Sequence, residues 1–180
     1  MKMKKSILIV LFMGMLTGCE KEKTPLPTEL PPITEEGKNT FGCIVENEIY
    51  VPEIRRTSWS IPGSQSEPIE FTFPQYPYYF FRVSTIRLVD KDDNLMDAQV
   101  EFMVDSCVFK PGRYRFSHIS VIYEDIAYSS YSIDNDSLII TKIDTLNNII
   151  SGQFNFRVTD ISTFSKNINI TNGRFDLKIK

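Results

Sequence analysis

Apolar residues at alternate positions are the feature of this sequence that most constrains its fold. Residues 98–104, 152–158 and 174–180 each carry apolar side chains at every second position, with polar side chains between them. A period of two residues with one polar face is typical of half-buried antiparallel strands. No stretch after residue 38 shows the 3.6-residue period of an amphipathic helix. The pattern therefore predicts an all-β domain.

Turn-forming residues divide this region into short segments. The strongest signal is Asn172-Gly173, which predicts a two-residue hairpin between strands over 167–171 and 174–180. Further signals lie at Asn47, Pro62-Gly63, Pro111-Gly112 and Asn147-Asn148. Many short strands with few or no helices are typical of sandwiches and barrels. We therefore expect about ten strands in a single antiparallel β-sandwich or closed barrel.

The N-terminus has the three-part layout of a secretory signal peptide. A basic start precedes an apolar run over residues 7–16, which is too short to span a bilayer as a helix. The sequence Leu16-Thr17-Gly18-Cys19 follows and resembles the lipobox of a bacterial lipoprotein. The resemblance implies a signal peptide over 1–18, cleavage before Cys19 and lipidation of Cys19. We therefore expect an outer membrane lipoprotein of the cell envelope, attached to the membrane through its lipid anchor.

A proline-rich segment separates Cys19 from the strand-like region. Four prolines between residues 25 and 32 disfavour regular helix or sheet and favour an extended chain. This composition predicts a disordered tether over 19–37 and an all-β domain over 38–180. At ~3.1 Å per residue, such a tether would hold the domain on the order of 50 Å from the lipid.

The charge of the chain limits its partners. The whole sequence carries a net charge of −3, and loss of three lysines with the signal peptide lowers this to −6. A mildly acidic chain gains nothing from a phosphate backbone, so we expect no nucleic acid as a partner.

Two cysteines remain once Cys19 is assigned to lipid. Cys43 and Cys107 form an even pair in an oxidising compartment, where a disulfide between them is one interpretation. The other is a pair of buried free thiols, since each cysteine lies in an apolar, strand-like context. We favour free thiols because a domain of this length does not need a disulfide to be stable.

Residues suited to catalysis are scarce. His118 is the single histidine, and the sequence contains no Gly-x-Ser-x-Gly motif and too few histidines and cysteines for a zinc site. A hydrolase using the carboxylates of Asp97 and Glu101 is the weakest hypothesis, because paired carboxylates on strands usually form a solvated face. We expect no catalytic residues, no cofactor and no enzyme activity.

An acidic run offers a weak alternative metal site. Asp90, Asp92 and Asn94 occupy positions 1, 3 and 5 of a calcium loop, and Glu101 occupies position 12. The glycine that such a loop needs at position 6 is replaced by Leu95. An acidic hairpin turn is the better interpretation.

Two further features could mediate binding or modification. Residues 71–81 carry seven aromatic residues interrupted by two prolines, and Tyr76, Tyr78 and Tyr79 form a candidate aromatic patch for a glycan or envelope protein. The alternative is that half of this run belongs to the core. Ser137 and Thr145 each lie in an Asp-Ser/Thr-apolar sequence that resembles an O-glycosylation signal of Bacteroidetes envelope proteins.

Both ends of the domain resemble a family of small Bacteroidetes lipoproteins that carry a domain of unknown function. The resemblance rests on the Gly-Lys-Asn-Thr-Phe-Gly-Cys opening at 37–43, the Ser-Gly-x-Phe strand at 151–154 and the Gly-Arg-Phe-Asp sequence at 173–176. It implies an envelope location and an all-β fold, but no activity. We therefore expect a non-enzymatic binding or assembly module, with a lipocalin-like carrier of a small apolar ligand as the alternative.

Overall fold

The computed structural model describes residues 27–54, 67–72, 80–88, 98–105, 110–130 and 137–178. These ranges contain 12 strands and no helix, which confirms the prediction of an all-β domain. Within them, no helix is long and apolar enough to cross a membrane.

The strands are numbered in chain order. They are β1 (Thr40–Val45), β2 (Glu48–Tyr50), β3 (Glu53–Ile54), β4 (Ile69–Thr72), β5 (Phe80–Leu88), β6 (Ala98–Asp105), β7 (Gly112–Tyr114), β8 (His118–Tyr123), β9 (Ile126–Ser130), β10 (Ser137–Asp144), β11 (Ile149–Asp160) and β12 (Asn167–Lys178).

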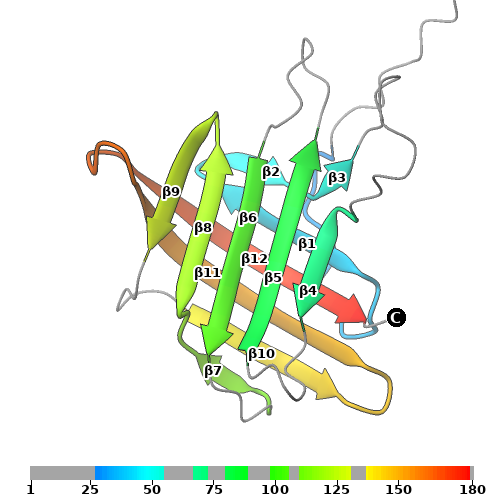
Figure 1. Ribbon diagram of the computed structural model, residues 1–180. Coiled ribbons are helices and arrows are strands. Elements are labelled where there is room, and N and C mark those ends of the chain that lie inside the picture. The colour runs from blue at the N-terminus through cyan, green and yellow to red at the C-terminus, as the bar shows by residue number, and fades with distance from the viewer. Residues whose placement is uncertain are drawn as a thin grey trace, which may run out of the picture.

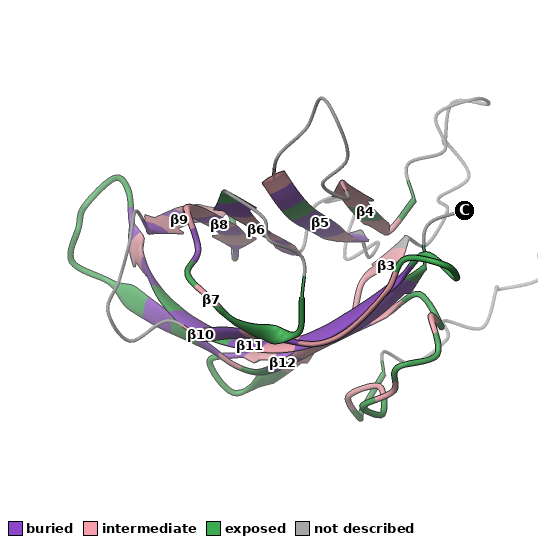
Figure 2. Ribbon diagram, turned by 90° about the horizontal axis from the view of Figure 1, so that it is seen from below, coloured by how far each residue is buried: buried purple, intermediate pink, exposed green. Residues whose placement is uncertain are grey.

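All strands belong to one strongly curled sheet with the shape of a half-barrel (Figure 1). The first limb contains β2, β1, β12, β11, β10 and β7, and the second contains β9, β8, β6, β5, β4 and β3. The limbs join where the end of β11 pairs with β9, through Thr159 with Ser129 and Asp160 with Tyr128. Figure 2 shows the two limbs facing each other across the interior. Every pairing is antiparallel except that of β3 with β5.

The hairpin predicted at Asn172-Gly173 is wrong, because β12 runs continuously through both residues. They form a bulge instead, and the register shifts there against β11 on one side and β1 on the other. Asn172 has a positive φ of 52°. A Cβ on Gly173 would lie 2.4 Å from the ring of Phe154 on β11, so the glycine is needed for this close approach rather than for a turn.

Phenylalanine rings from both limbs fill the interior. Phe102 of β6 is fully buried and lies at the centre, with its ring centroid 5.1 Å from that of Phe154 and 5.3 Å from that of Phe116. Other rings around Phe102 are those of Phe41, Phe81, Phe156 and Phe175. Alternation along the strands directs these side chains inward, and offset or edge-on aromatic pairs add to the hydrophobic stabilisation.

Part of the predicted tether is bound to the outer face of the first limb. We call residues 30–38 the strap. A Cβ on Gly42 of β1 would lie 2.6 Å from Cδ of Pro31, and Nζ of Lys142 donates a hydrogen bond of 2.8 Å to the carbonyl of Glu35. The sequence places the domain boundary at residue 38, whereas contacts with the sheet begin at residue 30. Prolines prevent the strap from pairing as a strand, so side chains of the sheet hold it instead.

Candidate functional site

The half-barrel has a seam where the edge of the first limb, at β1 and β2, faces the edge of the second limb, at β3 and β4. The chain itself crosses this seam at one end. β2 belongs to the first limb, and after Val51 and Pro52 the chain enters β3, which pairs in parallel with β5. The limbs are therefore covalently connected at this end of the seam.

Buried polar contacts tie the two limbs together at the same end. The hydroxyl of Tyr50 on β2 lies 3.0 Å from that of Thr85 on β5, and Thr85 in turn donates to the carbonyl of Val100. Nη1 of Arg87 donates to the carbonyl of Ile49 at 3.0 Å. The guanidinium of Arg87 also lies 5.3 Å from the centre of the Tyr50 ring, within range of a cation–π interaction.

Cys43 lies beside this polar bridge, and burial keeps its thiol unreactive. The structure has Cys43 as a free, fully buried thiol, and burial raises the pKa of that thiol despite the nearby positive charge of Arg87. Because the thiolate is the reactive form, Cys43 is unsuited to nucleophilic chemistry. Cys107, its alternative disulfide partner, lies outside the described residues.

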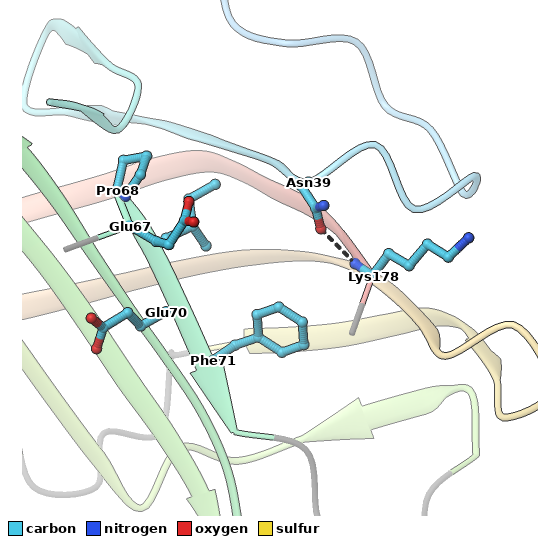
Figure 3. A pocket seen from close by; sticks show the side chains of 7 residues that line it. Asn39, Glu67, Pro68, Glu70, Phe71 and Lys178 are labelled. Atoms are coloured by element: carbon cyan, nitrogen blue, oxygen red, sulfur yellow. Dashed lines mark hydrogen bonds between the residues drawn. The ribbon is translucent and has the colours of Figure 1, made fainter. Parts of the chain in front are cut away.

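The other end of the seam is open and forms a groove. Its volume is about 390 Å³, within the range that holds a small ligand or a few side chains. The groove lies between β4 and the last residue of β12, and its walls are formed by Asn39, Glu67, Pro68, Ile69, Glu70, Phe71 and Lys178 (Figure 3).

Apolar and charged side chains occupy different parts of the groove. Phe71 projects from β4 toward the Lys178 end of β12, whereas the Glu70 carboxylate projects to the opposite side of β4 (Figure 3). Ile69 and Phe71 also pack against the core, so the floor is apolar and firmly supported. On the far wall, the backbone N–H of Lys178 donates a 2.8 Å hydrogen bond to Oδ1 of Asn39, which fixes the end of β12 against the start of β1.

β4 contributes one of its strand edges to this groove. Residues Ile69–Thr72 pair with β5 over Thr85–Arg82, and within the described ranges no strand pairs with the opposite edge of β4. A strand with unpaired N–H and C=O groups is a template for association with another chain. The groove therefore combines an apolar floor, a charged rim and backbone groups that can accept a partner.

The candidate site residues predicted from the sequence do not form one cluster among the described residues. Those outside the described ranges are Cys19, Cys107, Tyr76, Tyr78, Tyr79, Asp90, Asp92, Asn94 and Asp97. Over the part of the chain that is described, no three His, Cys, Asp or Glu side chains are grouped to hold a metal ion. Glu101 accepts a 2.8 Å charge-assisted hydrogen bond from Arg82 across β5 and β6, which is a structural role.

The two sequences that resemble O-glycosylation signals lie in different surroundings. Thr145 is exposed on the turn between β10 and β11, followed by Leu146, whose residue surface is 93% exposed. Ser137 is the first residue of β10, is half-buried, and precedes the fully buried Leu138. Of the two hydroxyls, that of Thr145 is the more accessible to an enzyme.

Sequence reasoning missed most of the groove. Phe71 belongs to the aromatic run that it singled out, but Glu67, Ile69 and Lys178 have no motif in common. They meet only because the sheet curls and brings β4 close to the end of β12. No protein-family model, no curated protein and no solved structure matches this chain.

Proposed function

We propose that this chain is a lipid-anchored protein of the cell envelope with a non-enzymatic role in binding or assembly, and that the groove is its contact surface for a protein partner. One observation carries the proposal: the groove lies at the open end of the seam, directly beside the edge of β4 with which no described strand pairs. The other end of the seam is occupied by the β2–β3 crossing and the Tyr50–Thr85 contact.

A polypeptide fits this surface better than a small molecule does. The edge of β4 that pairs with no strand among the described residues offers backbone hydrogen bonds to a second main chain, and the apolar floor at Ile69 and Phe71 offers a place for its side chains. Glu67 is exposed just before β4, and Lys178 is exposed on the opposite wall, so the rim carries both signs of charge for the selection of a partner.

The carrier alternative receives less support. A lipocalin-like carrier keeps an open apolar cavity inside a closed barrel. Here Phe102, Phe154 and their neighbouring rings occupy the space between the limbs. We propose that the limbs function as the two layers of a β-sandwich with a packed core, rather than as the wall of a ligand-holding barrel.

The strap changes the expected distance from the membrane. If Cys19 carries the lipid, about ten residues lie between it and the start of the strap. An extended link of this length would reach roughly 30 Å, which is shorter than a wholly free tether allows. The domain would therefore remain near the membrane surface, where neighbouring envelope proteins are concentrated.

The test introduces the substitution Phe71→p-benzoylphenylalanine into the full-length chain. The variant is expressed in the cells from which the chain comes, and these cells are irradiated to start crosslinking. This aromatic replacement keeps a ring at the groove and crosslinks whatever occupies it. The proposal expects a discrete protein adduct that disappears in a Glu67→Lys/Glu70→Lys variant and persists in the surface control Arg113→Glu. Adducts with lipid or small molecules alone would support the carrier instead, and absence of any adduct would contradict both.

A further inference from the structure

The backbone of β4 directs its N–H and C=O groups alternately to the two sides of the strand. The backbone N–H of Ile86 on β5 donates to the carbonyl of Pro68 at 3.0 Å, so two residues further on Glu70 also turns its backbone groups toward β5. The N–H and C=O groups of Ile69 and Phe71 therefore point the opposite way. No strand among the described residues pairs with that edge, which offers two donors and two acceptors to an added strand.

The side chains of β4 divide between two faces. Ile69 and Phe71 pack against the core and form the floor of the groove, whereas Glu70 is exposed. Figure 3 shows the Phe71 ring and the Glu70 carboxylate on opposite sides of β4. Side chains of an added strand would alternate in the same way, so those opposite Ile69 and Phe71 would enter the groove and the one between them would lie on the outer face. The two that enter the groove must be apolar to match its floor.

The outer face beside β4 carries an excess of negative charge. Arg82 on β5 donates a 2.8 Å hydrogen bond to the carboxylate of Glu101 on β6. This bond is the main cause that raises the pKa of Arg82, and the nearby charge of Glu70 raises it further. Two carboxylates thus share one guanidinium, which leaves one negative charge uncompensated within this group.

The position opposite Glu70 is where a charge on an added strand would act most strongly. All pairings in this sheet except that of β3 with β5 are antiparallel, and in an antiparallel pair wide hydrogen-bonded positions alternate with closer non-hydrogen-bonded ones. Ile69 and Phe71 would occupy hydrogen-bonded positions, so Glu70 would lie in the closer pair, with Cα atoms about 4.5 Å apart. Opposite charges stabilise such a pair and like charges destabilise it. A lysine or arginine at this position supplies the missing positive charge.

We propose that the groove receives an extended segment of a partner protein that adds to β4 as an antiparallel strand and carries a lysine or arginine between two apolar residues. The two apolar residues pair with the backbone groups of Ile69 and Phe71 and place their side chains in the groove. The basic residue meets Glu70 on the outer face. This inference rests on the proposed function and names the chemistry of the partner.

The test measures the binding of three cyclic β-hairpin peptides to the full-length chain in detergent, by fluorescence anisotropy. Cyclisation preforms the strand and lowers the entropic cost of binding. The first peptide exposes the sequence Val-Lys-Val with both valine N–H groups on its open edge, the second has glutamate in place of lysine, and the third carries N-methyl groups on both valines. The lysine peptide should bind about three- to tenfold more tightly than the glutamate peptide, because an opposite-charge pair replaces a like-charge pair. N-methylation removes two donors and should weaken binding by about tenfold or more.

Charge reversal in the protein gives the sharper result. Glu70→Lys changes one exposed side chain, so the fold is retained and the variant should prefer the glutamate peptide. The control Arg113→Glu changes an exposed charge on β7 and should keep the preference of the wild type. Equal binding of the lysine and glutamate peptides, an unchanged preference in Glu70→Lys, full binding of the N-methylated peptide, or no binding of any peptide would overturn the proposal.

The crosslink from Phe71→p-benzoylphenylalanine judges the proposed function separately. A protein adduct together with peptide binding that ignores charge would leave the proposed function standing while this inference fails. If the crosslink captures no protein, both fail.

Discussion

The carboxylate of Asp176 accepts a 2.6 Å hydrogen bond from the hydroxyl of Thr34, across 142 residues of sequence. The same carboxylate accepts hydrogen bonds from the hydroxyl of Ser151 at 2.8 Å and from the backbone N–H groups of Glu36, Gly37 and Lys38. Burial raises the pKa of Asp176, but these hydrogen bonds outweigh it and lower the pKa to about 2. A single buried charge thus fastens the strap to the sheet.

The first prediction concerns pH. The pKa of Asp176 is lower in the folded chain than its ordinary value of 3.8, so its stabilising effect is fully present above about pH 4 and is lost as pH falls toward 2. Water at the edge of the strap screens part of the effect. We therefore expect Asp176 to contribute on the order of 1–2 kcal/mol to the free energy of unfolding. Urea unfolding at pH 7 and pH 3 should show a smaller pH dependence for Asp176→Asn than for the wild type. Glu36→Gln, in the exposed part of the strap, is the matched control; equal pH dependence in all three proteins would contradict this account.

The second prediction concerns the aromatic core. Phe102→Ala removes the ring that contacts both limbs and leaves a cavity, so we expect a loss of about 3–5 kcal/mol in the free energy of unfolding. Leu146→Ala, at a 93% exposed position, should change it by less than about 0.5 kcal/mol. Denaturant titration measures both, and a loss below 1 kcal/mol for Phe102→Ala would mean that the limbs are not packed through this ring.

The third prediction compares the effects of substituting two glycines on stability. A Cβ on Gly173 meets the Phe154 ring at 2.4 Å, whereas the nearest atom to a Cβ on Gly112 is 4.0 Å away. Gly173→Ala should therefore destabilise the fold by about 1–3 kcal/mol, because the ring must move. Gly112→Ala should have little effect. Similar melting temperatures for the two variants would argue against the observed bulge in β12.

The fourth prediction concerns Cys43. Because burial raises the pKa of its thiol, Cys43 should resist iodoacetamide in the folded protein and react once urea unfolds the chain. Peptide mass spectrometry after labelling reports this residue separately from the other cysteines. Rapid labelling under native conditions, or recovery of Cys43 in a disulfide with Cys107, would contradict the buried free thiol.

Local pattern accounts for the parts of the fold that the sequence predicts correctly. Alternation marks β6, β11 and β12, because the side-chain period of a strand is a property of the backbone. The same local reasoning is wrong at Asn172-Gly173, because this dipeptide favours a hairpin but forms a bulge within β12. The deciding factor there is the Phe154 ring on a neighbouring strand, which no local pattern reveals.

Long-range contacts explain the other differences between the sequence-based prediction and the structure. The proline-rich composition of the strap correctly excludes a regular strand, but the position of Asp176 opposite Ser151 determines that the strap binds the sheet. The groove has the same origin, since Ile69 and Lys178 are 109 positions apart and meet through the curl of the sheet.

The most direct test of the central claim, that the groove beside β4 is the binding surface, is hydrogen exchange of the full-length chain. Amide exchange would be followed by mass spectrometry in membranes from cells that make the protein, where we propose that it is anchored, and again after dilution in detergent. We expect the peptide covering Ile69–Thr72 to exchange at least tenfold more slowly in the membranes, while β1, which already pairs with β12 and β2, stays unchanged. Equal exchange of β4 in both preparations would show that its edge remains free where the protein works, and would contradict the account.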